Sequence, residues 1–97
     1  MDVRGVLDAS EVEVAIERDG LAWELGDGHL VKVCEFADFA GAVEFFNKVA
    51  AVAERENHHP DIAVSWNKVE MSIVTHSKGG ITEKDLALAA LIDAIER

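Results

Sequence analysis

The sequence predicts an α+β fold in which helices pack on one face of a four-stranded antiparallel sheet. Two segments, residues 21–36 and 62–80, have the alternation and turn residues of β-hairpins, and a helical pattern follows each of them. A further helical pattern precedes the first hairpin, so the expected order is α-ββ-α-ββ-α. No strand–helix–strand pattern of a parallel crossover is present, which favours a two-layer α+β domain.

Composition predicts one cytoplasmic domain spanning residues 1–97. The hydrophobic fraction of 49% is that of a globular chain, and the net charge of −10 disfavours nucleic-acid and membrane-surface partners. With Cys34 as the only cysteine, no intrachain disulfide can form. The N-terminus lacks the pattern of a secretory signal, and the longest apolar run, Leu86–Ile92, is far shorter than the ~20 residues of a membrane-spanning helix.

The first twenty residues are expected to contain a lead-in and one short helix. Ser10 and Glu13 have the spacing of a capping box, and Gly20 follows as a helix terminator. The competing interpretation is a strand, because three apolar residues alternate: Val12, Val14 and Ile16. Since Ser10 and Gly20 mark both ends of the segment, we favour the helix.

The first hairpin is expected to turn at Gly-Asp-Gly, residues 26–28, and to return through a strand that begins at Leu30. Asp38 can then cap a long helix, which must end before Pro60 because the residue preceding a proline is pushed out of the α region. The apolar stripe of this helix is expected to consist of Phe39, Ala42, Val43, Phe46, Val49, Ala50 and Ala53.

The second hairpin is expected to run from Ile62 to Gly79-Gly80, with Trp23 and Trp66 in the core. Its apolar phase breaks at Asn67-Lys68, which indicates a tight turn or bulge. Thr82 and Asp85 then have capping-box spacing for a last helix. The buried face of that helix is expected to be Leu88, Leu91, Ile92 and Ile95. Because an open sheet has unpaired edges, we expect a homodimer or homotetramer formed through a sheet edge or the terminal helix.

Three histidines are candidates for acid–base chemistry: His58 and His59 in Asn-His-His-Pro, and His76 in Thr-His-Ser-Lys. All three fall at the ends of predicted elements, where a scaffold presents functional side chains. Adjacent side chains on an extended backbone point in opposite directions, so His58 and His59 are not expected to act on the same atom. His76 can approach them only if its strand lies beside the His-His-Pro turn. The competing interpretation is that all three are surface loop histidines.

A metal site is a second alternative, because three histidines can hold zinc. No His-x-His or His-x₃-His pair is present, and Cys34 falls in a predicted strand as a small buried hydrophobe, so no metal is expected. Glu54 precedes His58 by one helical turn and could favour its charged form if the helix extends that far. A solvated helix residue is the simpler interpretation of Glu54.

Taken together, the segment from Glu54 to Asp85 reads Glu-x₃-His-His-Pro-x₅-Trp-x₉-His-x₈-Asp. This pattern resembles the signature of pterin-4a-carbinolamine dehydratases, a family also known as dimerisation cofactors of a homeodomain transcription factor. The flanking sequences Asp38-Phe39, Trp66-Asn67-Lys68-Val69 and Thr82-x-x-Asp85 resemble the family as well. The resemblance covers residues 21–97 and leaves out the first twenty.

The resemblance implies a lyase that eliminates water from 4a-hydroxy-tetrahydropterin to give quinonoid dihydropterin, as in tetrahydrobiopterin recycling. Two proton transfers complete this reaction, so neither a metal nor an organic cofactor is implied. By matching positions, His58 and His76 would be the acids on either side of the pterin. His59 would position the substrate, and Glu54 would support the cluster.

The same resemblance implies that Pro60 fixes the turn, that Trp66 lines the site and that Asp85 caps the last helix. Two other functions stay open at this point. One is a non-catalytic dimerisation or protein-binding module, which three intact imidazoles disfavour. The other is action on a molybdopterin-type pterin, which the sequence does not distinguish from the first substrate.

Overall fold

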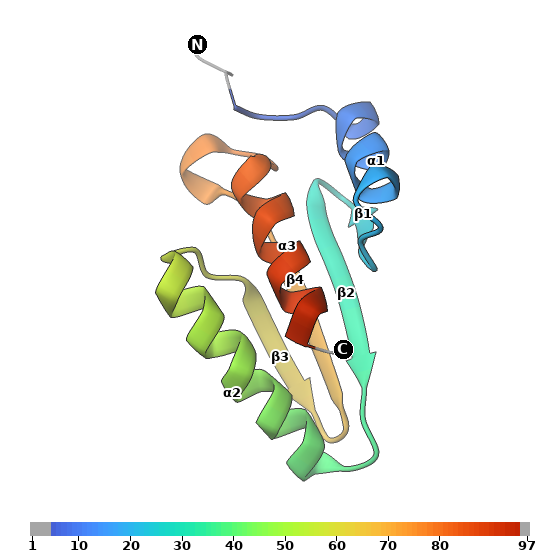
Figure 1. Cartoon of the computed structure of the whole chain (residues 1–97), viewed down its shortest axis with the longest axis vertical. Helices are drawn as coiled ribbons and strands as arrows, with labels where there is room; N and C mark the ends of the chain where they lie inside the picture. The colour runs from blue at the N-terminus through green and yellow to red at the C-terminus, as the bar shows by residue number, and fades with distance from the viewer. Residues whose placement is uncertain (1–4, 96–97) are drawn as a thin grey trace.

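The computed structural model describes residues 5–95 and confirms the predicted order of elements (Figure 1). The strands form one antiparallel sheet in the order β1-β2-β4-β3, with α2 and α3 side by side over one face. None of the helices in the described part of the chain is long and apolar enough to cross a membrane. The elements are α1 (Ala9–Arg18), β1 (Glu24–Gly26), β2 (His29–Glu35), α2 (Phe39–Glu56), β3 (Asp61–Ser65), β4 (Lys68–Ile73), the 3₁₀ turn η1 (His76–Lys78) and α3 (Glu83–Ile95).

The first segment is the helix α1, as favoured, but its capping box is not the predicted one. Asp8 is the N-cap: the Glu11 amide donates to Asp8 Oδ1 at 2.8 Å, and the Asp8 amide donates to Glu11 Oε1 at 2.9 Å. Ser10 and Glu13 therefore lie inside the helix. Both pairs have the same i, i+3 spacing, and aspartate is as strong an N-cap as serine, so spacing alone could not choose between them.

The first hairpin turns at Asp27-Gly28, inside the predicted Gly-Asp-Gly sequence. Both residues have positive φ, 54° and 82°, which is the requirement of a two-residue hairpin turn with the twist of the flanking strands. Pairing then begins at Gly26 with His29. Trp23, which precedes β1, is buried as predicted.

Helix α2 begins and ends as predicted, but its buried stripe is rotated. Asp38 accepts a hydrogen bond from the Gly41 amide at 2.8 Å, and Asn57, with φ of 53°, ends the helix ahead of Pro60. The residues that face the core are Ala42, Phe45, Val49 and Ala53. Phe39 is exposed and Phe46 only half-buried, because the Phe45 ring packs against Phe36 with the ring centroids 5.1 Å apart.

The second hairpin turns at Trp66-Asn67, close to the predicted break, but Trp66 is not a core residue. Its side chain is 69% exposed and its φ is 51°, a backbone conformation that costs a non-glycine residue about 1–2 kcal/mol. Asn67 holds the turn by donating to the Phe36 carbonyl at 2.9 Å. The prediction that Trp66 is buried is therefore wrong: the turn directs it outward after the last residue of β3.

The sheet has one covered and one open face. Leu30, Cys34, Val69, Met71 and Ile73 are buried beneath the helices, and Leu86, Leu88, Ala89 and Ile92 of α3 pack with them in the same core. Leu91 and Ile95 are only partly buried. The alternate residues of β2, β3 and β4 point to the other face, where no helix of residues 5–95 lies.

Near the C-terminal end of α3, the buried carboxylate of Asp93 ties the helix to the first hairpin. Asp93 accepts hydrogen bonds from the Ala22 amide at 2.8 Å and from Trp23 Nε1 at 2.8 Å. It also pairs with Lys32 Nζ at 2.7 Å, and the two charged side chains are only 9% and 5% exposed. Three donors thus satisfy one buried charge, which fixes β1 and β2 against the end of the helix.

We expect Asp93→Ala to lower the free energy of unfolding by roughly 3–5 kcal/mol, because it leaves the buried Lys32 ammonium without its carboxylate. Urea unfolding of the variant and of wild type would measure the change. The control is Asp19→Ala, which removes an exposed pair with Arg18 and should leave the urea midpoint almost unchanged. Equal midpoints for the two variants would contradict this account.

Candidate functional site

The predicted histidines lie at the same end of the sheet because of strand pairing. β3 and β4 are antiparallel with Asp61 opposite Ser72, so the start of β3 and the end of β4 lie at the same end of the sheet. His58 and His59 precede β3, and His76 follows β4 in η1. The condition that the strand of His76 lies beside the His-His-Pro turn is therefore met.

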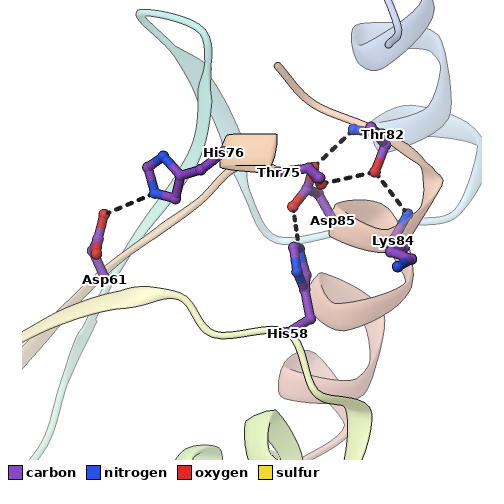
Figure 2. A network of polar contacts seen from close by, with 7 residues as sticks. All are labelled: His58, Asp61, Thr75, His76, Thr82, Lys84 and Asp85. Carbon is purple, nitrogen blue, oxygen red and sulfur yellow. Dashed lines mark hydrogen bonds and ion pairs between the residues drawn. The ribbon is translucent and has the colours of Figure 1, made fainter. Parts of the chain in front are cut away.

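His58 is held by Asp85 at the start of α3. His58 Nε2 lies 2.5 Å from Asp85 Oδ1, and the two side chains are 15% and 0% exposed (Figure 2). The backbone of His58 is fixed as well, since its amide donates to the Ala53 carbonyl at 3.1 Å just after α2 ends. This histidine is therefore a positioned group, which contradicts the surface-loop interpretation for it.

The other oxygen of Asp85 completes a directed chain of hydrogen bonds. Asp85 Oδ2 accepts from Thr75 Oγ1 at 2.8 Å and from the Thr82 amide at 2.7 Å. Because Thr75 donates its one hydroxyl hydrogen to Asp85, Thr82 must donate in the 2.9 Å bond between the two hydroxyl groups. The Lys84 amide then donates to Thr82 Oγ1 at 3.3 Å. The predicted capping role of Asp85 is confirmed, and Asp85 also anchors a histidine.

This arrangement decides which nitrogen of His58 can do chemistry. An ionised carboxylate only accepts hydrogen bonds, so Nε2 carries the hydrogen that points at Asp85. Nδ1 is then the ring nitrogen that Asp85 does not engage. A buried carboxylate behind an imidazole orients the ring, as in other acid–base sites.

His59 and Glu54 form a second pair, so the possible pairing of Glu54 with His58 is not the one observed. His59 Nε2 lies 2.5 Å from Glu54 Oε2, and both side chains are largely exposed. The possible pairing of Glu54 with His58 required the helix to continue through His58. The left-handed Asn57 ends it one residue earlier and turns His58 toward α3 instead.

His76 points to Asp61, the first residue of β3. His76 Nε2 is 4.0 Å from Asp61 Oδ2, and the two side chains are 74% and 73% exposed. Figure 2 shows the His76 ring directed away from His58, on the other side of the Thr75 segment. Each of the three histidines thus has its own carboxylate, from a different part of the chain.

The remaining predicted site residues divide into two groups. Pro60 lies between His59 and β3, where it joins the cluster to the sheet. Trp66 follows the far end of β3, so the length of the hairpin separates it from the histidines of the same chain. Sequence reasoning missed Asp61 and Thr75; their only local signal is that they stand directly beside Pro60 and His76.

Known proteins resemble this chain along almost its whole length. The model of the family described as pterin 4 alpha carbinolamine dehydratase matches residues 6–95. The chain belongs to this family.

Relatives in two bacteria carry the dehydratase name provisionally. A protein of Acidobacterium capsulatum is 49% identical over 74 residues, which are 76% of this chain and 80% of that one. A protein of Mycobacterium sp. (strain KMS) is 44% identical over 90 residues, which are 93% of this chain and 95% of the relative.

Two solved structures share the fold of this dehydratase-family chain. A transcriptional coactivator/pterin dehydratase from Brucella melitensis superposes with a TM-score of 0.85 at 32% identity, over 93% of this chain and 97% of that one. A pterin dehydratase-like protein described as a RuBisCO assembly factor in the alpha-carboxysome superposes with a TM-score of 0.62 at 25% identity, over 77% of this chain and 87% of the other.

We expect Asp85→Ala to destabilise the protein by roughly 3 kcal/mol, because it leaves buried donors from Thr75 and Thr82 unpaired. The variant should also release the ring of His58, so that its nitrogen NMR signals no longer report a single Nε2–H tautomer. Urea unfolding and ¹⁵N spectra of the histidine rings would measure both effects.

The matched control is Asp38→Ala, which removes the exposed N-cap of α2 and should cost only about 1 kcal/mol without changing His58. If His58 kept the same tautomer in the Asp85→Ala variant, Asp85 would not be the group that orients it.

Proposed function

We propose that this protein is a dehydratase for 4a-hydroxy-tetrahydropterins. Membership of the pterin-4a-carbinolamine dehydratase family supports the substrate class. The observation that carries the proposal is the anchored histidine: His58 is held by the fully buried Asp85 and keeps one nitrogen for a ligand. A lyase of this kind works by proton transfer and needs no redox partner.

The proposed reaction consists of two proton transfers and one bond cleavage. An acid protonates the 4a-hydroxyl group, the carbon–oxygen bond breaks, and the oxygen leaves as water. A base removes a proton from a ring nitrogen, so that a carbon–nitrogen double bond replaces the lost bond and the product is the quinonoid dihydropterin. Histidines suit both steps because their proton exchange lies near neutral pH.

In this proposal His58 and His76 serve the two faces of the pterin. His58 acts through Nδ1, since Nε2 is engaged by Asp85. His76 has the greater freedom, with a single distant carboxylate and an exposed side chain. His59, paired with Glu54, positions the substrate. Pro60 holds the adjoining backbone, and Trp66 takes part only if another copy of the chain supplies it.

A protein-binding role without catalysis is the second candidate. It is favoured by the similarity to a pterin dehydratase-like protein that is described as a RuBisCO assembly factor. The anchored His58 argues for the enzyme, because a binding scaffold does not require an imidazole backed by a buried carboxylate. Turnover of a 4a-hydroxy-tetrahydropterin distinguishes the two.

We expect His58→Ala and His76→Ala each to reduce the dehydration rate, and His59→Ala mainly to raise KM. A positioned acid or base contributes about 10²–10⁴-fold, so the loss should be visible above the uncatalysed reaction. Each single variant should keep part of its activity on a substrate racemic at C4a, and the double variant almost none. Stopped-flow absorbance with synthetic 4a-hydroxy-tetrahydropterin would measure the rates.

The same assay with EDTA tests whether a metal takes part, and wild-type activity should survive chelation. A folded His58→Ala, His76→Ala double variant that dehydrated the substrate at the wild-type rate would contradict the proposed mechanism. Loss of activity on chelation, restored by zinc, would replace it with a histidine metal site.

We also propose that the protein forms dimers through β3. In the described chain β3 pairs only with β4, and four of its five residues are exposed, so a row of backbone groups is open to a second copy. Light scattering at micromolar concentration should report a dimer or a larger assembly. Val64→Lys on β3 should weaken it, whereas Val14→Lys on the exposed face of α1 should not. Monomer alone in the wild type would contradict the proposal.

A further inference from the structure

His29, the fourth histidine of the chain, is held across two strands of the sheet. It is the first residue of β2, and its ring Nδ1 lies 2.7 Å from Ser72 Oγ on β4. Both side chains are half-buried. Within residues 5–95 the structure gives the other ring nitrogen, Nε2, no hydrogen-bond partner. The ring is therefore fixed through one nitrogen, and the described part of the chain does not engage the other.

The pair formed by His29 and Ser72 points to the open face of the sheet. Their neighbours Leu30 and Ile73 are fully buried on the covered side. Because successive side chains of a strand point to opposite faces, His29 and Ser72 point away from the helices. A substitution of either residue therefore leaves the hydrophobic core intact.

Ser72 connects this pair to the candidate site. It lies opposite Asp61 of β3 in the strand register, and the side chains of opposite residues share one face. Asp61 in turn faces His76, with 4.0 Å between Oδ2 and Nε2. A row of four polar side chains thus crosses the end of the sheet that carries the candidate site: His76, Asp61, Ser72 and His29.

The row borders a hollow on the open face of the sheet. Asp61 and Ser72 line this hollow of about 640 Å³, together with Val31, which lies opposite Ser72 on β2. Neighbouring strands are about 4.8 Å apart, so Ser72 lies about one strand spacing from Asp61. A substituent of a few atoms, on a ring held beside His76, is long enough to reach Ser72 and His29.

The chemistry of the row suits an uncharged, hydroxylated group. The serine hydroxyl both donates and accepts hydrogen bonds, and a neutral imidazole has one nitrogen for each role, so both can pair with hydroxyl groups. A phosphate or carboxylate is disfavoured, because Glu24, Asp61 and Glu70 place like charges around the hollow. An apolar substituent would cover His29 Nε2 without giving it a hydrogen-bond partner, which is costly.

We propose that His29 and Ser72 determine substrate specificity by binding a hydroxylated substituent at C6 of the pterin. This rests on the proposed dehydratase function, which places the reacting C4a between His58 and His76 at the end of the sheet. Only N5 separates C6 from C4a in the pterin ring, so a group at C6 begins close to His76. It then extends along the row toward Ser72, while the ring stays at the end of the sheet.

Steady-state kinetics with two 4a-hydroxy-tetrahydropterins tests the proposal, one with a dihydroxypropyl group at C6 and one with a propyl group. Wild type should have the higher kcat/KM for the hydroxylated substrate, mainly through a lower KM. His29→Ala and Ser72→Ala should each reduce the ratio of the two kcat/KM values about fivefold, as expected for the loss of one hydrogen bond. Ser72→Thr keeps a hydroxyl group and should keep the ratio.

The matched control is Ser65→Ala, which removes a hydroxyl group from an exposed position at the other end of β3 and should leave the ratio unchanged. A binding measurement separates this proposal from the dehydratase reaction. A stable 7,8-dihydropterin with the dihydroxypropyl group should shift the ¹⁵N signals of the His29 ring, whereas its propyl analogue should not.

An unchanged ratio in Ser72→Ala, or equal shifts of the His29 ring with both dihydropterins, would overturn the proposal. Tighter binding of a dihydropterin whose substituent ends in a phosphate would overturn it as well, because the row would then select negative charge. If wild type turned over neither substrate, the dehydratase function would fail, and the ¹⁵N titration would still decide whether His29 and Ser72 bind the substituent.

Discussion

The site depends on one buried charge, the carboxylate of Asp85. With no exposure to solvent, this group must be satisfied entirely by protein donors, because an unpaired buried charge costs several kcal/mol. Its donors come from three segments: His58 after α2, Thr75 at the end of β4, and Thr82 before α3. Satisfying Asp85 therefore fixes where these segments meet, and it fixes the orientation of His58 at the same time.

A second buried carboxylate, Asp93, fixes the position of the first hairpin, as Asp85 fixes the position of His58. It binds Lys32, Trp23 and the backbone of Ala22 near the other end of α3, and so holds the first hairpin. The helix is thus attached by a buried charge at each end. Burial of charge is a weak source of net stability but a strong constraint on geometry, since a displaced partner leaves the charge unpaired. Rigid placement of His58 follows from this constraint.

The order of elements and most of their ends could be predicted because the signals are local. Asp38, Asn57-His58-His59-Pro60 and Thr82-x-x-Asp85 act on the backbone within a few residues, and the hairpin turns contain or adjoin their glycine and asparagine residues. The position of the histidines also followed from strand pairing. Where two local signals were equivalent, as with Asp8 and Ser10 at α1, the sequence did not distinguish them.

The partners of the site residues could not be predicted, because they are set by tertiary packing. Glu54 could have paired with His58 only in a continuous helix, but a single left-handed residue redirected the chain and Glu54 pairs with His59. The hydrogen bond between His58 and Asp85 joins residues 27 positions apart, so no local sequence pattern indicates it. The burial of Trp66 was wrongly predicted because the alternation of apolar residues indicated a strand position. In the structure this residue lies in the hairpin turn.

The central claim is that His58, presented through Nδ1 by Asp85, and His76 act together on a pterin. The crystal structure of the protein with a stable 7,8-dihydropterin bound would test it most directly. The account predicts the pterin ring at the end of the sheet, with His58 Nδ1 and His76 on its two faces and each within about 3 Å of a ring or leaving-group position. A pterin bound on the open face of the sheet, or one that left His58 Nδ1 without a contact, would contradict it.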